Sequence, residues 1–100
     1  MSFLYSTRAR ISGFAPDAVA WSNEVAQLIT NSLGTKVEVA ARLGGGQDLV
    51  WLSRHASLSE LEASLDRIQQ ARDYQAMVKH AVDKGFFDPA SIDTGLWRLL

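Results

Sequence analysis

The stretch KVEVAARLGGGQDLVWLSRH, from Lys36 to His55, decides the fold, because it holds two runs of strand-forming residues joined by a glycine-rich turn. Apolar and polar residues alternate in both runs, as they do in strands that bury one face. Three glycines in a row also occur in phosphate-binding loops. Gly44–Gly46, however, neither precede a Lys-Ser/Thr pair nor open a helix. The pattern therefore favours a plain hairpin of two antiparallel strands.

The residues before this hairpin predict a strand and then a helix. Phe3 to Ser12 alternates between apolar and polar side chains, which is the period of a half-buried strand. Pro16 fits a first helical turn, where its missing N–H costs nothing. Apolar side chains then recur at helical spacing from Asp17 to Leu33, and Gly34 is a typical residue just past a helix end.

The residues after the hairpin predict a helical region in two pieces. Ser57 with Glu60 three residues later is a capping-box pattern and marks a helix start. After Arg72 the apolar stripe moves to another side of the helix, which a straight helix would not do. We therefore expect a break near Arg72-Asp73, with Asp73 capping a second short helix that ends at Gly85.

A last strand is predicted from Ser91 to Leu100. The order of elements is then strand, helix, strand, strand, helix, strand, which is the α+β, ferredoxin-like β-α-β-β-α-β plan. We expect a four-stranded antiparallel sheet with two helices on one face, the second of them broken. This plan uses residues 1–100 as a single domain.

Helices on one face divide the side chains of each strand into two sets. The set expected to face the helices is apolar: Phe3, Tyr5, Ala9, Ile11, Val37, Val39, Ala41, Leu43, Leu49, Trp51, Trp97 and Leu99. The opposite set mixes arginine with apolar residues: Leu4, Ser6, Arg8, Arg10, Glu38, Ala40, Arg42, Val50, Leu52, Arg54, Leu96 and Arg98. Arginines buried without partners are strongly unfavourable, so we expect this second set to face away from the helices.

The arginine-bearing face has three interpretations: a solvated surface, an anion-binding site, or a surface covered by a second sheet. Leucine and valine mixed with arginine are typical of a covered surface. Arginine suits such a face because its planar fork pairs with carboxylates and is weakly hydrated. We therefore predict a homodimer. Its interface would contain Arg8, Arg10, Arg42, Leu52, Arg54 and Arg98.

The plan, together with the ending DYQAMVKHAVDKGFFDPASIDTGLWRLL (residues 73–100), resembles the dimeric α/β barrel superfamily. Within that superfamily it is similar in style to the small antibiotic-biosynthesis-monooxygenase-like and NIPSNAP-like proteins. The resemblance implies two sheets packed face to face with the helices outside. It also implies a ligand cavity between each protomer's own sheet and helices.

The haem-degrading members of that superfamily use an Asn, a Trp and a His, with the His on the second helix. Here His80 lies on that helix but is expected to face away from the apolar stripe. The first strand has no Asn and the second helical region has no Trp. We therefore do not expect haem degradation, and we expect no cofactor.

Four residues are candidates for a site between sheet and helices. Tyr5, Trp51 and Trp97 either fill the core or form the walls of a pocket for a flat apolar ligand. His55 ends its strand in phase with Trp51 and is either a catalytic acid–base group or a strand-end residue. Ser53 beside His55 lacks an orienting third group, so it does not suggest a triad. No cluster of His, Asp and Glu suggests a metal site.

Composition narrows the function further. A net charge of −1 argues against a nucleic-acid binder, and the arginine-bearing face also lacks aromatics on the first and third strands for base stacking. We see no signal peptide and no membrane span, and we expect a soluble, cytoplasmic protein.

The leading hypothesis is a dimer that binds a small hydrophobic or aromatic molecule, with cofactor-independent, monooxygenase-like activity left open. The alternative is a non-catalytic dimeric module with a filled core.

Overall fold

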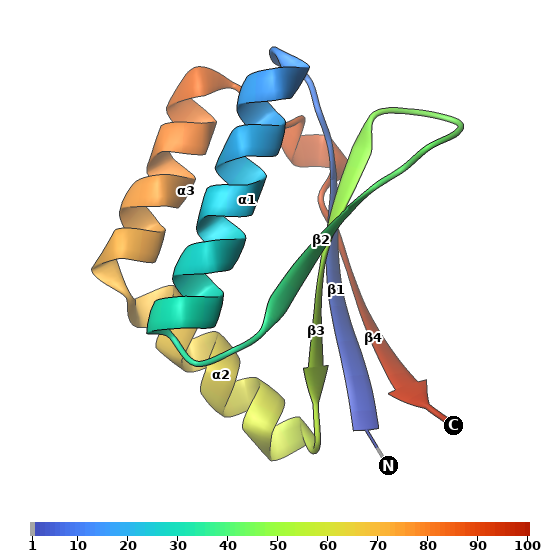
Figure 1. Cartoon of the computed structure of the whole chain (residues 1–100), viewed down its shortest axis with the longest axis vertical. Helices are drawn as coiled ribbons and strands as arrows, with labels where there is room; N and C mark the ends of the chain where they lie inside the picture. Colours follow the sequence, from blue (N-terminus) through green and yellow to red (C-terminus); the bar gives the residue numbers. More distant parts are fainter. Residues whose placement is uncertain (1) are drawn as a thin grey trace.

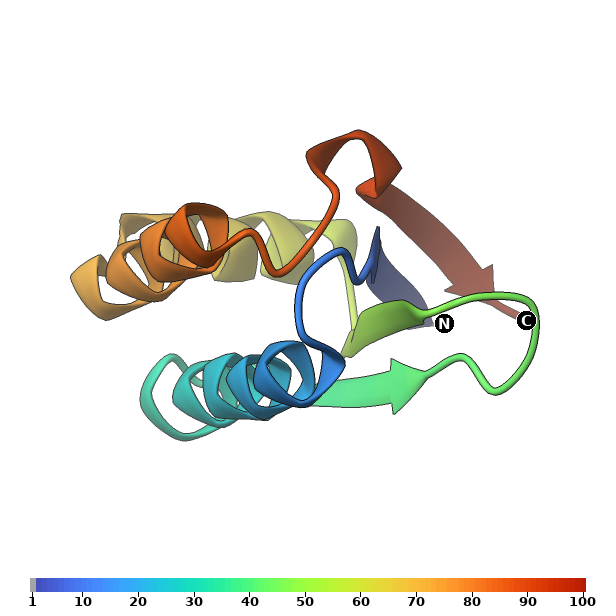
Figure 2. The same cartoon turned by 90° about the horizontal axis from the view of Figure 1, so that it is seen from above.

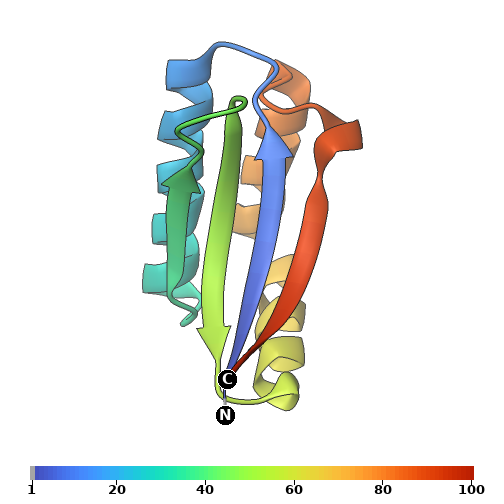
Figure 3. The same cartoon turned by 90° about the vertical axis from the view of Figure 1, so that its right-hand side faces the viewer.

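A computed structural model describes residues 2–100 and confirms the predicted fold class. A four-stranded antiparallel sheet in the order β2-β3-β1-β4 packs against a layer of helices, which is the ferredoxin-like arrangement. Figures 1 and 2 show the three α-helices on one side of this sheet. Figure 3 looks onto the other face, which none of the α-helices covers and which we call the open face. The elements are β1 (Ser2–Arg10), α1 (Ala15–Ser32), β2 (Val37–Ala41), β3 (Asp48–His55), α2 (Leu58–Gln70), α3 (Arg72–Lys84), the short 3-10 helix η1 (Pro89–Ser91) and β4 (Asp93–Leu99).

The second helical region is broken, as the shift of its apolar stripe predicts. Ala71 has extended backbone angles (φ −73°, ψ 123°) and separates α2 from α3. The predicted cap at Asp73 is wrong. α3 begins at Arg72 with Ala71 in the cap position, so Asp73 lies in its first turn. There its carboxylate still meets the positive end of the helix dipole. The predicted end at Gly85 is confirmed by its left-handed backbone (φ 64°).

The start of α2 has the predicted cap at Ser57, with one difference from the standard capping box. Ser57 Oγ accepts a hydrogen bond from the backbone N–H of Glu60 at 3.1 Å, which satisfies an amide that the first helical turn would leave unpaired. The Glu60 carboxylate accepts from the backbone N–H of Ala56 at 3.1 Å, one residue before the cap, and this bond ties α2 to the end of β3.

The core lies between the sheet and the helices. Val25 and Ile29 of α1 and Ile68 of α2 are buried together, and Trp51 of β3 packs against them from the sheet. A second buried group, formed by Ala18, Ala81 and Phe86, lies nearer the other end of α1. The helical members of both groups lie on the apolar stripes of their helices, so for them helical periodicity in the sequence and burial in the structure agree.

The predicted faces hold for β1, β2 and β3 but not for β4. Directly opposed residues of an antiparallel pair share a face. Trp97 lies opposite Leu4 and is therefore on the open face, whereas Arg98 lies opposite Phe3 on the helix side. The assignments of Trp97 to the helix side and of Arg98 to the open face are wrong. Leu99 and Leu96 exchange faces in the same way.

The physical reason is that β4 is an edge strand that buries neither face well. Leu96 on one face is 52% exposed and Trp97 on the other is 59% exposed. Hydrophobicity sorts residues to a face only where one face is buried, so the pattern in β4 does not set its phase. The strand also starts later than predicted. Asp88 accepts a hydrogen bond from Ala90 N–H and starts η1 there.

Candidate functional site

The helix side of β3 carries Trp51, Ser53 and His55, all of which the sequence analysis discussed. Trp51 packs edge-on against Trp21 and Phe87, with ring centroids 6.2 Å and 5.4 Å apart. The Trp21 indole N–H donates to the backbone oxygen of Met77 at 2.9 Å. The Trp51 indole N–H is buried and has no acceptor within residues 2–100. Burying a donor without a partner is costly, and nearly all buried donors in proteins have one.

Tyr5 lies on the helix side of β1, directly opposite Ser53. Tyr74 of α3 is close to it. Burial raises the pKa of the Tyr74 hydroxyl above its ordinary value, and the neighbouring Tyr5 hydroxyl raises it further. The Tyr74 phenol therefore stays protonated near neutral pH and can donate or accept a hydrogen bond.

His55 ends β3 on the same face and is 6% exposed. Its Nε2 atom shares a hydrogen bond with Ser53 Oγ at 2.7 Å, and Ser53 is also buried. Burial lowers the pKa of the His55 imidazole below 6.5, while the Glu60 carboxylate opposes this shift. A neutral imidazole at pH 7 is a proton acceptor, which is the state a general base requires. The catalytic role predicted for His55 stays a prediction.

The two best-formed hollows in residues 2–100 lie away from these aromatics. The smaller one, about 270 Å³, lies between α1 and the β2 residues Val37 and Val39. The larger one is on the open face. Neither is lined by Tyr5, Trp51 or His55. Trp97 is on the other side of the sheet, so it cannot share a helix-side pocket with them.

The open face combines a band of apolar side chains with arginines, as the sequence predicts. Trp97 adds to this band, and its indole N–H donates to Ser6 Oγ at 3.3 Å. Of the predicted interface residues, Arg8, Arg10, Arg42, Leu52 and Arg54 lie on this face, and only Arg98 does not. The apolar members of the band are Leu4, Val50, Leu52, Trp97 and Leu99.

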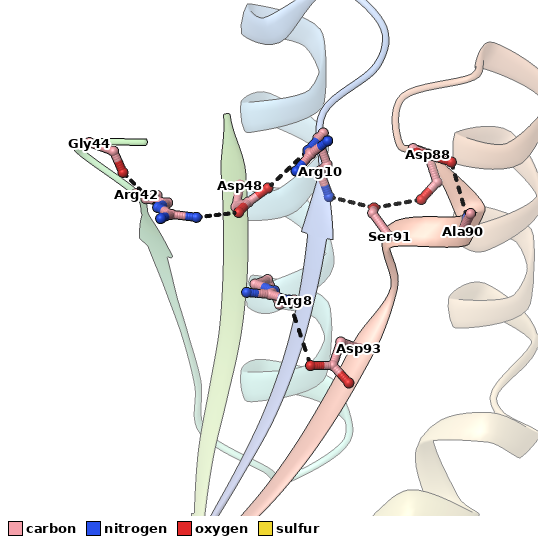
Figure 4. Close-up of polar contacts among 9 residues, drawn as sticks. All are labelled: Arg8, Arg10, Arg42, Gly44, Asp48, Asp88, Ala90, Ser91 and Asp93. Atoms are coloured by element: carbon pink, nitrogen blue, oxygen red, sulfur yellow. Dashed lines mark hydrogen bonds and ion pairs between the residues drawn. The ribbon is translucent and has the colours of Figure 1, made fainter. Parts of the chain in front are cut away.

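The larger hollow, about 490 Å³, lies at the end of the open face nearest the β2–β3 turn, and we call it the arginine hollow. Figure 4 shows a row of polar side chains crossing the strands there. Arg42 Nη1 contacts the Asp48 carboxylate at 3.1 Å, and Arg10 Nε contacts it at 3.6 Å. The charged residues that line the arginine hollow are Arg8, Arg10, Arg42, Asp48, Asp88 and Asp93.

The sequence interpretation missed the aspartates of this hollow. The sequence pattern places Asp48 in the turn after Gly44–Gly46, but the structure has it in β3, in phase with Val50 and Leu52 on the open face. That phase was the signal that could have identified it. Asp88 and Asp93 lie some 40 residues further along the chain and reach the hollow only through the pairing of β4 with β1.

No group of three or more His, Cys, Asp or Glu side chains in residues 2–100 is arranged to hold a metal ion. The helices of the same residues are either too short or too polar to cross a membrane.

No protein-family model and no curated protein matches the sequence. Solved structures match its fold. A NIPSNAP domain protein from Burkholderia xenovorans has a TM-score of 0.80 at 13% identity, over 98% of this chain and 94% of that one. SnoaB, a cofactor-independent oxygenase from Streptomyces nogalater, has a TM-score of 0.72 at 8% identity, over 99% and 93%. An antibiotic-biosynthesis-monooxygenase-like protein from Deinococcus radiodurans has 0.68 at 11%, over 100% and 93%. The chain therefore has the ferredoxin-like fold of these NIPSNAP and monooxygenase-like structures.

Proposed function

We propose that the protein binds a small, flat, largely apolar molecule on the helix side of the sheet, against Tyr5 and Trp51. The observation that carries this proposal is the buried indole N–H of Trp51, which has no acceptor among residues 2–100. A hydrogen bond made to it by a ligand would recover about 1–3 kcal/mol of desolvation cost. The aromatic rings around it supply the apolar surface that such a ligand would contact.

Binding at this position requires the helix layer to move away from the sheet, because the two best-formed hollows of residues 2–100 lie elsewhere. Ala71 provides a joint for this movement, since the helical backbone is interrupted there between α2 and α3. A displacement of α3 would carry Tyr74 and Met77 away from Trp51 and open space above the sheet. The proposed site is therefore formed by an opening of α3 rather than preformed.

His55 gives this site a proton acceptor. The hydrogen bond to Ser53 holds the imidazole in place, and burial keeps it neutral at pH 7. A bound phenol would hydrogen-bond to the imidazole, which would take up the phenol's proton as a general base while the phenol reacts. SnoaB is a cofactor-independent oxygenase, so oxygenation of a bound aromatic compound, with O2 as co-substrate, is the first reaction to test.

We further propose that the protein is a homodimer that pairs through its open face. The apolar band with its exposed Trp97 is the kind of surface that a second sheet covers. Arg54 and Glu38 lie on this face, and neither takes part in an ion pair within residues 2–100. Each residue in a two-fold interface meets its counterpart reciprocally, so Arg54 of each copy can pair with Glu38 of the other.

The second candidate is the non-catalytic dimeric module. The observation in its favour is that Trp51 already makes edge-on contacts with Trp21 and Phe87. On this view Trp51 simply fills the core. The two candidates differ in what happens when aromatic compounds are added.

The test is a screen of flat phenolic and quinone compounds by native mass spectrometry and by NMR, comparing Trp51→Phe with Trp97→Phe. Both variants remove an indole, but only the first removes the unpaired N–H on the helix side. We expect Trp51→Phe to weaken binding by about fivefold or more, as the loss of one hydrogen bond predicts. Trp97→Phe should leave binding unchanged. No binding to wild type, or equal effects of both variants, would favour the filled core.

A further inference from the structure

The arginine hollow differs from an ordinary solvated surface because a buried charge organises it. The Asp48 side chain is only 9% exposed although it is charged, and Arg42 and Arg10 both contact its carboxylate. Arg42 is held a second time, because its Nε–H donates to the backbone oxygen of Gly44 at 2.6 Å. A paired, buried carboxylate with two arginines on it is a fixed arrangement rather than a set of freely rotating side chains.

The wall on the β4 side is fixed as well. The backbone N–H of Arg10 donates to Ser91 Oγ at 2.8 Å, and Ser91 Oγ donates to the backbone oxygen of Asp88 at 2.6 Å. These bonds join β1 to η1, so both sides of the hollow are connected to the same strand (Figure 4). Arg8 reaches Asp93 across the hollow at 3.7 Å.

The arginines of the hollow carry more N–H donors than their contacts within residues 2–100 use. Each guanidinium carries five N–H donors. Within residues 2–100, Arg42 uses two of its donors in hydrogen bonds, whereas the Arg8 and Arg10 side chains make ion pairs at 3.7 and 3.6 Å, longer than a hydrogen bond. The three arginine side chains are still 53%, 62% and 48% exposed. Donors are therefore left over at the hollow, and a ligand that offers several acceptors would match them.

We propose that the arginine hollow binds a small oxyanion, a carboxylate or a phosphate, between the guanidinium groups of Arg10, Arg42 and Arg8. The planar arginine fork matches both groups in a two-pronged geometry. The three aspartates balance the three arginines in charge, so the hollow does not attract polyanions in general. It selects one compact anionic group that fits against the arginines and away from Asp88 and Asp93.

The test is a titration followed by ¹H–¹⁵N NMR, with inorganic phosphate and succinate as separate probes and sodium chloride holding the ionic strength constant. We expect saturable changes in the chemical shifts of the Arg10 and Arg42 Nε–H groups and of the Gly44 amide. Saturation by phosphate, by succinate or by both supports the proposal and names the preferred group. Shifts that do not saturate, or that chloride reproduces, would mean screening of surface charge and would overturn it.

Variants distinguish a specific anion site in the hollow from a general effect of surface charge on anion binding. Arg10→Gln and Arg42→Gln should each weaken binding about tenfold or more, since each removes charge-assisted hydrogen bonds. Arg54→Gln is the matched control, because it removes the same charge from the same face outside the hollow. It should change affinity less than about twofold. Equal losses in all three variants would overturn the proposal, and the NMR spectra themselves report whether each variant is folded.

The hollow is formed within one chain, so the proposed anion site is built without the dimer and without the helix-side site, and pairing through the open face would cover it. Leu52→Asp, which is designed to separate the dimer, should therefore bind the anion at least as well as wild type does. Loss of binding in this variant would show that a second copy completes the site, which contradicts the proposal as stated.

Discussion

Leu52→Asp is the sharpest test of the proposed dimer. Leu52 lies in the middle of the open face, with Ser6 opposite it on β1 and Glu38 opposite it on β2. The substitution places a carboxylate in the apolar band and directly across from another acid. We expect it to prevent pairing while leaving the protomer folded, because its side chain is on the face away from the helices and the core.

The expected loss in the free energy of dimerisation follows from the two-fold symmetry. An unpaired charge buried in an interface costs about 3–5 kcal/mol, and a symmetric dimer acquires two of them. The dimer would therefore lose roughly 6–10 kcal/mol, which raises its Kd by at least about four orders of magnitude. Such a change converts a stable dimer into a monomer at micromolar concentration.

Sedimentation velocity measures the outcome, with circular dichroism to confirm the fold. Val82→Asp is the matched control, because Val82 is 70% exposed on α3, on the far side of the helix layer from the open face. It should sediment as the wild type does. A wild-type monomer at micromolar concentration would refute the dimer, and an unchanged Leu52→Asp dimer would show that pairing uses another surface.

Three further predictions concern the protomer. Burial lowers the pKa of His55 in the folded state, so the unfolded chain binds the proton more tightly. The stability from the neutral imidazole is therefore complete above pH 6.5 and is lost as the pH falls through the lower folded pKa. His55→Gln should show less loss of unfolding free energy than wild type between pH 7 and 5, measured by urea denaturation. Ser57→Ala should lower the unfolding free energy by about 1 kcal/mol through loss of the α2 cap, whereas Ser59→Ala, inside the helix, should not. Gly85→Ala should cost about 1–2 kcal/mol because of the positive φ, while Gly44→Ala, without that constraint, should be nearly neutral in the same assay.

Much of the fold could be predicted from local patterns. The capping box at Ser57, the left-handed stop at Gly85 and the break before α3 all depend on neighbouring residues or on helical periodicity. The faces of β1 and β3 were also predictable, because each has a strand on both sides and a helix layer over one face. Burial of one face forces period-two sorting, so the sequence of such a strand reports its phase.

The tertiary structure alone decided the rest. β4 is an edge strand with both faces exposed, so its residues carry no burial signal, and only its pairing with β1 moved Trp97 to the open face and Arg98 to the helix side. The arginine hollow brings Arg8 and Arg10 together with Asp88 and Asp93, which are about 80 residues away along the chain. The contact of Trp51 with Trp21 likewise depends on how α1 packs on the sheet. A local pattern reports which residues a strand or helix buries. Which distant charges and rings then meet is set by strand order, register and helix packing, because these determine the distances between side chains that the sequence separates.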